Sequence, residues 1–388
     1  MIRSLELFCG TGGLALGLHQ AGFEPTALIE WDKDSCDNIK YNIANGFADV
    51  KKWNVIQEDA RLVNYQSIGN GVQFITGGPP CQPFSLGGKH MAHSDRRDMF
   101  PEAVRAVREI RPIGFIFENV KGLLRKSFSK YFNYIILQLT YPDIVKTNDM
   151  DWEKHLSVLE QHHTSTNHSQ VEYNVVFRLL NAADYGVPQI RQRVIIVGFR
   201  KDIPAEWSFP IATHSKEDLL YDKYISGKYW EEHKISHNNR DEISSTEKDR
   251  ILRYFKERPH KLRWQSVRDA LSGLPDPSLG NANNFFNHDF RGGAKTYIGH
   301  SGSTMDEPSK TIKAGAHGVP GGENMIRLDN GTTRYYTVRE SARIQTFPDD
   351  YKFCSSWTES MRQIGNAVPV KLAKAIGNSI NRHFGGVL

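Results

Sequence analysis

The sequence predicts an α/β fold, in which a mostly parallel sheet carries helices on both faces and a smaller, irregular region comes late in the chain. Three observations lead to this prediction. Short apolar runs alternate with helix-length stretches over the first 200 residues, glycine- or proline-rich loops follow some of these runs, and the alternation stops after residue 199. Strands that alternate with helices are typical of a parallel sheet covered on both sides.

The expected strands are the apolar runs at residues 5–8, 26–29, 74–76, 114–117, 175–179 and 194–197. The expected helices between them are residues 13–21, 34–42 and 100–109, and helical periodicity returns at 339–345 and 371–384. The polar segment 142–172 contains four irregularly spaced histidines and is expected to be a surface insertion, with solvated histidines rather than metal ligands.

The composition is that of a soluble globular chain with two or three domains. It has 388 residues, of which 39% are hydrophobic and 24% are charged. No apolar run approaches the roughly 18 residues of a membrane-spanning helix. The N-terminus shows no secretory signal, so we expect a cytosolic protein.

Charge and cysteine usage limit the partners and cofactors of the chain. The excess of Lys and Arg over Asp and Glu is 49 − 44 = +5, which permits a nucleic-acid partner without demanding one. No two of the four cysteines form a C-x-x-C pair, so no metal site is expected. They are Cys9, Cys36, Cys81 and Cys354.

The first motif, LELFCGTGGLALGL, indicates a nucleoside cofactor. A predicted strand runs into Gly10 and Gly12, where the backbone can turn tightly and approach a ligand, and a helix follows. Glu30 ends the next strand, where an acidic residue accepts hydrogen bonds from ribose hydroxyls, and Trp31 beside it can lie against adenine. The motif does not choose between NAD and S-adenosylmethionine, and a purely structural turn is the alternative.

The second motif, GGPPCQPFS at residues 77–85, surrounds Cys81 with prolines. It leaves the carboxyl end of a predicted strand, where ligands bind in open α/β sheets. A stiff loop that presents one thiol suits a nucleophile, and a buried inert cysteine is the alternative.

Two further motifs supply charged groups. Glu118 ends the apolar run in FENV, and an apolar environment raises the pKa of a carboxyl so that it can act as an acid. In QIRQRVIIVG, Arg191 and Arg193 are expected on one face of a strand, where a guanidinium suits a carbonyl or phosphate oxygen. An ion-paired Glu118 and a surface pair of arginines are the alternatives.

The C-terminal third holds weaker signals. In QIGNAVPV, Gly365 and Asn366 predict a turn, and Pro369 then predicts the first turn of a helix. Residues 248–268 carry eight basic and two acidic side chains interleaved with aromatic ones, which indicates either a DNA-facing surface or a solvated helix face.

In this order the motifs resemble the cytosine carbon-5 DNA methyltransferase family, over residues 1–200 and 335–388. The resemblance implies a Rossmann-like S-adenosylmethionine-dependent catalytic domain made of residues 1–203 and 335–388. It makes residues 204–334 the target recognition domain, which reads base edges, and it favours the DNA-facing interpretation of the basic run.

The resemblance also implies roles for single residues. Cys81 is the nucleophile, Glu118 protonates or hydrogen-bonds N3 of cytosine, and Arg193, with Arg191, steadies the target base. Substrate contacts fall on Pro80, Ser85, Asn119 and Val120. The cofactor S-adenosylmethionine is expected against Phe8, Gly10, Gly12, Glu30, Trp31, Asp59, Ala60, Phe100, Asn366 and Val368.

The implied partner is double-stranded DNA, with one cytosine flipped out of the helix for methylation. The expected protein is a monomer in the bacterial cytosol, without an obligate protein partner, and functionally paired with a restriction endonuclease. Departures from the family pattern include Glu6 in place of Asp and Cys9 in place of Ala. The alternatives are a transfer-RNA cytosine-5 methyltransferase and a catalytically silent DNA-binding protein.

Overall fold

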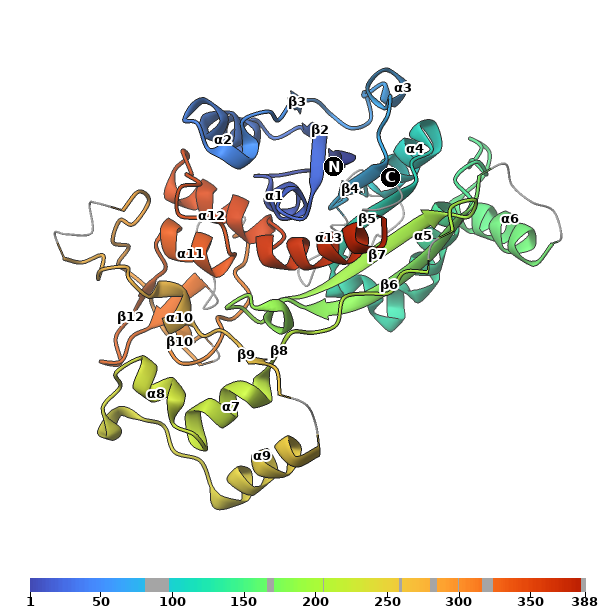
Figure 1. Ribbon diagram of the computed structural model, residues 1–388. Coiled ribbons are helices and arrows are strands. Elements are labelled where there is room, and N and C mark those ends of the chain that lie inside the picture. Colours follow the sequence, from blue (N-terminus) through green and yellow to red (C-terminus); the bar gives the residue numbers. More distant parts are fainter. Residues whose placement is uncertain are drawn as a thin grey trace. The chain divides into compact units, whose positions relative to one another are not determined.

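The computed structural model describes residues 1–80, 98–165, 171–204, 206–257, 260–279, 285–298, 300–315 and 324–384 (Figure 1). The chain divides into two compact units. Unit 1 comprises Met1–Leu180, Gln192–Phe209 and Ile376–Leu388, and unit 2 comprises Asn181–Arg191 and Pro210–Ala375. The division into a catalytic domain (1–203 and 335–388) and a target recognition domain (204–334), which was inferred from the sequence, stays a prediction.

A seven-stranded sheet forms the centre of the described part of unit 1, in the order β3-β2-β1-β4-β5-β7-β6. Its first five strands pair in parallel, and β7 runs antiparallel to β5, which confirms the expected mostly parallel α/β sheet. The three-residue strand β3 is not among the predicted elements, because it is too short and too exposed to give an apolar run. The strands are β1 (Ile2–Leu7), β2 (Phe23–Glu30), β3 (Val55–Gln57), β4 (Phe74–Gly77), β5 (Gly114–Val120), β6 (Tyr173–Asn181) and β7 (Gln192–Arg200).

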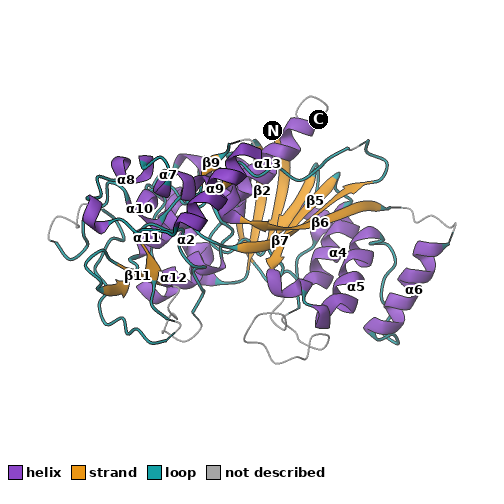
Figure 2. Ribbon diagram, turned by 90° about the horizontal axis from the view of Figure 1, so that it is seen from below, coloured by secondary structure: helices purple, strands orange, loops and turns teal. Residues whose placement is uncertain are grey.

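Helices α4 (Phe100–Ile110) and α5 (Ser129–Thr140) cover one face of this sheet (Figure 2). The buried positions of α4 recur at helical spacing and join alternate residues of the strands in one apolar core. On the other face Phe74 makes edge contacts with Phe23, Phe199 and Phe384. The other helices of this unit's N-terminal part are α1 (Gly13–His19), α2 (Lys33–Ala44) and α3 (Tyr65–Ile68).

The polar segment 142–172 contains a helix that its sequence did not predict, α6 (Trp152–Thr164). Asp151 caps its N-terminus by accepting a hydrogen bond from the backbone of Lys154. His155 is buried against α5, where its ring nitrogens lie 2.8 Å from the Tyr134 hydroxyl and 3.0 Å from the Ile144 carbonyl. Burial lowers the pKa of His155, so this histidine is a neutral core residue.

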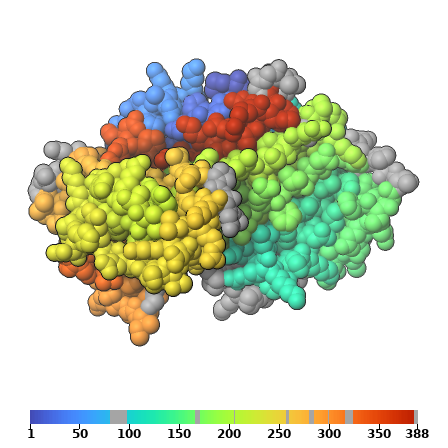
Figure 3. Space-filling model, turned by 60° about the horizontal axis from the view of Figure 1, so that its bottom comes forward, coloured from blue at the N-terminus to red at the C-terminus, as the bar shows by residue number. Residues whose placement is uncertain are grey.

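Unit 2 is built from short elements. Helices α7 and α8 share a small core of Leu219, Tyr229 and Trp230, and α9 packs against α7. The region of residues 216–257 forms the yellow-green to yellow surface in Figure 3. The helices are α7 (Lys216–Tyr224), α8 (Lys228–Glu232), α9 (Ser245–Glu257), α10 (Val267–Leu271), α11 (Val338–Ile344) and α12 (Trp357–Asn366), and α13 (Val370–Phe384) follows. The strands are β8 (His214–Ser215), β9 (Leu262–Arg263), β10 (Ser303–Thr304), β11 (Met325–Arg327) and β12 (Thr333–Tyr335).

The turn predicted at Gly365 and Asn366 is wrong, because these residues end helix α12. A Cβ atom at Gly365 would lie 2.4–2.7 Å from the backbone of Lys313 and Ala314. The glycine therefore serves close packing of a helix against another segment, not a turn. Among the described residues no helix is long and apolar enough to cross a membrane.

Candidate active site

The carboxyl ends of the parallel strands meet at one edge of the sheet. Leu7 at the end of β1 pairs with Ile29 of β2 and with Gly77 of β4, and Gly77 pairs with Phe117 of β5. The chain passes from β1 outward to β2 and β3, and β4 then lies on the other side of β1. Ligands bind at such a reversal of strand order, so this edge is the candidate active site.

The loop after β1 contains three residues in the left-handed backbone region. Phe8 has φ 55°, Gly10 has φ 52° and Gly12 has φ 80°, and α1 begins directly after them. A Cβ atom at Gly12 would lie 3.0 Å from Trp53, whereas one at Gly10 would meet no described atom within 4 Å. Gly12 is thus required by the turn and its packing, while Gly10 leaves an open side that a ligand can approach.

Glu30 holds this loop. Its carboxylate accepts hydrogen bonds from the backbone N–H of Gly10 at 2.8 Å, of Trp31 at 3.0 Å and of Asp32 at 2.9 Å. Burial raises the pKa of Glu30, and these hydrogen bonds act in the opposite direction. A carboxylate has about four acceptor positions, so little capacity is left for a ribose hydroxyl. Besides its predicted role at the cofactor, Glu30 therefore holds the loop after β1 in place, which the sequence did not reveal.

The remaining residues predicted at the cofactor surround the same edge. The Trp31 side chain is 71% exposed beside the loop. Asp59 follows β3 and pairs with Arg61, which lowers the pKa of Asp59. The Ala60 carbonyl accepts hydrogen bonds from Tyr65 at 3.1 Å and from Arg105 at 2.6 Å, and Phe100 is fully buried at the start of α4. Of the four residues in this paragraph, Trp31 and Asp59 therefore have side chains that a ligand can reach.

Asn366 and Val368 belong to unit 2. Asn366 is exposed as the last residue of α12, and Val368 is buried after it. Their predicted cofactor contacts stay predictions.

Glu118 and Arg193 form a nearly buried ion pair. They lie on the antiparallel strands β5 and β7, diagonally across the register in which Val120 faces Arg193. The Arg193 Nε donates to Glu118 Oε1 at 2.6 Å, and the two side chains are 12% and 10% exposed. Burial lowers the pKa of Arg193, and Glu118 raises it. The ion pair fixes one oxygen of the Glu118 carboxyl group.

The loop after β4 comes close to this pair. A Cβ atom at Gly78 would lie 3.3 Å from Glu118 Oε2, so this loop leaves little room beside the carboxyl group. The Asn119 Nδ2 donates to the Pro79 carbonyl at 2.9 Å, and the backbone of Met99 donates to the carbonyl of the exposed Pro80 at 3.1 Å. Residues 78–80 therefore lie close to Glu118 and Asn119, and Met99 is hydrogen-bonded to the end of this segment. Cys81 and Ser85 lie outside the described residues.

Arg191 has a different environment from Arg193. It precedes β7, is 1% exposed and donates to three backbone carbonyls within unit 2, those of Ile312 at 3.0 Å, Gly365 at 2.7 Å and Ala367 at 3.1 Å. This arrangement favours a role in holding unit 2 together.

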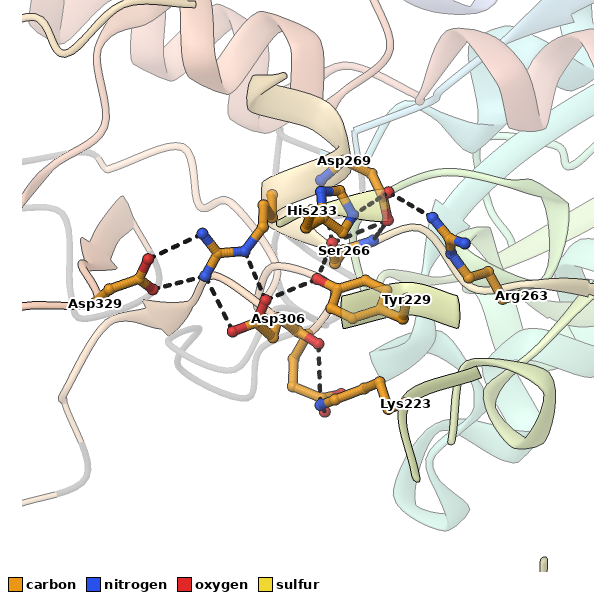
Figure 4. Close-up of polar contacts among 10 residues, drawn as sticks. Lys223, Tyr229, His233, Arg263, Ser266, Asp269, Asp306 and Asp329 are labelled. Carbon is orange, nitrogen blue, oxygen red and sulfur yellow. Dashed lines mark hydrogen bonds and ion pairs between the residues drawn. The ribbon is translucent and has the colours of Figure 1, made fainter. Parts of the chain in front are cut away.

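Part of the basic run 248–268 is also structural. Arg263 pairs with Asp269 at 3.0 Å, as Figure 4 shows, and with Glu232 at 2.5 Å. Arg268 pairs with Asp306 at 2.7 Å and with Asp329 at 2.6 Å. Each arginine side chain is 14% exposed. These two arginines join segments of unit 2, whereas the basic side chains on α9 keep the exposure that a DNA-facing surface requires.

Glu6, the second-last residue of β1, is a further buried carboxyl group. Its Oε2 accepts from the Thr76 hydroxyl at 3.2 Å, and burial raises its pKa from 4.5 to about 8. The unfolded chain therefore releases the Glu6 proton at lower pH than the folded chain does. The free energy of unfolding is highest, as far as Glu6 is concerned, below pH 4.5, and it decreases as the pH rises from 4.5 toward 8.

We expect Glu6→Gln to remove this loss. Between pH 4.5 and 8 the variant should gain stability over the wild-type protein by up to about 1.4 kcal/mol per pH unit. Urea unfolding of both proteins at a series of pH values measures the difference. A difference that does not change over this range would contradict a buried, protonated Glu6.

The sequence of the chain matches a known protein family and is similar to known methyltransferases. Residues 2–142 and 154–382 match the family described as C-5 cytosine-specific DNA methylase. The chain is 33% identical to Type II methyltransferase M.PspPI of Psychrobacter sp., over 97% of this chain and 78% of the relative. It is 32% identical to Type II methyltransferase M.NgoMIV of Neisseria gonorrhoeae, over 97% and 96% of the two chains.

Solved structures share the fold. One is a putative DNA modification methyltransferase encoded within a prophage of E. coli, with a TM-score of 0.58, 20% identity and coverage of 99% and 100% of the two chains. Another is the Dnmt2 methyltransferase of S. pombe, with a TM-score of 0.55, 17% identity and coverage of 100% and 99%.

Proposed function

Because the chain belongs to the C-5 cytosine-specific DNA methylase family, and is a DNA cytosine-5-methyltransferase of the type II restriction–modification kind, we propose that it methylates cytosine through a covalent adduct of Cys81. The observation that carries this proposal is the Glu118–Arg193 pair at the carboxyl edge of the sheet, beside the loop that leads to Cys81. In this proposal the methyl donor is S-adenosylmethionine and the substrate is a cytosine flipped out of duplex DNA.

The residues that follow β1, β2 and β3 fit an S-adenosylmethionine molecule. The open side of Gly10 admits a close ligand, the exposed Trp31 ring offers a face for adenine, and Asp59 offers a carboxylate for hydroxyl groups. When bound, this cofactor supplies an electrophilic methyl group on a sulfonium.

The chemistry of the chain's own residues follows from the weak nucleophilicity of cytosine carbon 5. The Cys81 thiolate adds to carbon 6, so that a carbon–sulfur bond forms and the ring becomes an electron-rich enamine. Glu118 supports the addition by placing its carboxyl group at N3, where negative charge would otherwise develop. Once carbon 5 is methylated, water takes the proton from carbon 5, the carbon–sulfur bond breaks, and Cys81 is regenerated as the thiolate.

Arg193 acts through Glu118. Because its Nε holds Oε1, the carboxyl group is oriented and Oε2 is left on the side of Gly78 to meet the base. Asn119 holds the proline loop through the Pro79 carbonyl, so the nucleophile and the carboxyl group come from segments that are tied together.

The proposal extends to partners and location. We propose that the sequence reader is residues 204–334, of which 210–334 belong to unit 2, and expect a monomer in the bacterial cytosol that protects DNA against a companion restriction endonuclease. The names of the relatives, which are Type II methyltransferases, support the pairing.

The test is bisulfite sequencing of a plasmid carried by a host without cytosine methylation that expresses the protein. We expect protected cytosines in one short sequence context, and none when Cys81→Ser is expressed at the same level. Binding of S-adenosylmethionine to both purified proteins should be equal. Protection that persists in the Cys81→Ser variant would overturn the covalent mechanism, and no protection with the folded wild-type protein would overturn DNA as the substrate.

A further inference from the structure

One loop of unit 2 exposes an unusual set of large apolar side chains. Phe290, Tyr297 and Ile298 are 52%, 61% and 102% exposed, and all described residues from 289 to 298 except Ala294 are exposed. We call residues 289–298 the arm. Large apolar side chains that are exposed close together in the sequence are a candidate binding surface.

The arm is held firmly at both ends. On its N-terminal side His288 is buried, with its ring nitrogens 3.0 Å from the Thr337 hydroxyl and 2.8 Å from the Pro275 carbonyl. On its C-terminal side the buried Ser303 accepts a hydrogen bond from the backbone of Lys310 at 3.0 Å. The exposed side chains therefore project from a fixed base, and a partner can meet them without ordering the anchors first.

The tip of the arm is a tight turn. Tyr297 and His300 form an isolated antiparallel β-bridge with backbone hydrogen bonds of 2.8 and 3.4 Å, so the chain reverses its direction next to Ile298. A chain reversal that exposes its side chains in this way is narrow enough to enter the major groove of B-form DNA, which is about 12 Å wide.

The charges of the arm suit an anionic partner. Arg291 and Lys295 are exposed, and among the described residues neither forms an ion pair. The Arg291 guanidinium lies 5.1 Å from the centre of the Trp357 ring, which holds it in place while leaving its charge available. Asp289 is the one acidic residue of the arm, so cations outnumber anions next to the apolar tip.

We propose that the arm is a specificity element for the DNA substrate: Tyr297 and Ile298 at its tip contact base edges in the major groove, and Arg291 and Lys295 contact the flanking phosphates. The proposal rests on the proposed reader in unit 2 and names residues within it. An aliphatic side chain discriminates bases through the methyl group of thymine, and an aromatic ring adds contact area, whereas phosphate contacts carry no sequence information. The two cations beside the tip favour a polyanion such as DNA, and a protein partner is an outcome that the test separates.

The first experiment measures selectivity. Once plasmid sequencing has identified the methylated site, initial rates are compared on duplexes with that site and with each single base-pair change. We expect Ile298→Ala and Tyr297→Ala to lower the preference for the correct base pair at one position by about tenfold or more. Val145→Ala is the control, because Val145 is 51% exposed and lies outside the proposed reader, and it should keep the wild-type preference.

The second experiment measures the salt dependence of binding to the same duplexes. Arg291→Ala and Lys295→Ala should weaken binding to all sequences alike and lower the slope of log K against log salt by about one each. Lys154→Ala, at an exposed position of α6, should leave the slope unchanged. Equal thermal unfolding midpoints show that the variants are folded.

The outcomes separate the two proposals. A wild-type protein that methylates no DNA would overturn the proposed function itself. An active wild-type protein whose arm variants keep both its base preference and its salt slope would overturn the role of the arm, including the case in which the exposed tip serves a protein partner.

Discussion

Glu118→Gln is expected to slow methyl transfer by about 10²- to 10⁴-fold, the range that a positioned acid–base group contributes. Glutamine keeps the size of the side chain and an oxygen for the 2.6 Å contact with the Arg193 Nε, but it carries neither a negative charge nor an acidic proton for N3. Single-turnover rates on a duplex substrate measure the effect. Binding of S-adenosylmethionine is expected to stay within about threefold of the wild-type value, because Glu118 lies outside the proposed cofactor contacts.

Arg193 provides the internal control for this experiment. Since Arg193 acts by orienting Glu118, Arg193→Met should also slow the reaction, and the double variant should be no slower than Glu118→Gln alone. Both variants leave a buried group with an altered partner, so rates are compared at a temperature at which all the proteins are folded. Losses that multiply in the double variant would show that Arg193 contacts the substrate independently, and a Glu118→Gln variant that reacts at the wild-type rate would remove Glu118 from the mechanism.

Arg191→Met is expected to destabilise the protein by on the order of 4 kcal/mol. The wild-type guanidinium donates to the carbonyls of Ile312, Gly365 and Ala367, and each hydrogen bond from a charged donor contributes about 1.5–3 kcal/mol. Methionine fills a similar volume but leaves three carbonyls without this donor, in a place that is closed to water. Urea unfolding at constant pH measures the loss.

Two control variants accompany Arg191→Met, one that keeps the positive charge and one that replaces an exposed arginine. Arg191→Lys keeps the positive charge but cannot reach three carbonyls as a planar fork, so we expect an intermediate loss. Arg253→Met, on the exposed side of α9, should change stability by less than about 0.5 kcal/mol. If Arg191→Met were as stable as Arg253→Met, the three hydrogen bonds would not hold unit 2 together.

The parallel sheet could be predicted from sequence because its strands are buried on both faces. Such strands appear as continuous apolar runs, as in Phe115–Phe117 and Val194–Val197. Each run can be recognised in the sequence without knowing which strands lie beside it. The strand β3 and the helix α6 were missed for the opposite reason. The three residues of β3 are partly exposed, and α6 buries only His155, Leu156 and Leu159 of its thirteen residues. Short or polar elements of this kind depend on what they pack against.

The site shows the same division. Glycine and proline motifs mark loops at the sheet edge because their backbone limits are local properties. No local pattern indicates that Glu30 is occupied by the backbone of Gly10, or that Glu118 meets Arg193, a partner 75 positions further along the chain. The sequence also could not tell Arg191 from Arg193, since the two stand in the same motif and differ only in their surroundings.

By itself, the sequence determined the α/β class, the order of the motifs and, through that order, the family. These follow from burial periodicity and backbone conformation, which act over a few residues. Only the tertiary structure decided which charges are used up inside the protein and which remain for a substrate. Arg191, Arg263 and Arg268 pair inside the protein with groups such as the Gly365 carbonyl and the Glu232 and Asp306 carboxylates. The arm, in contrast, keeps Arg291 and Lys295 exposed. The electrostatic role of a side chain depends on its partners and its access to water, and chain folding brings both together from positions that no local pattern links.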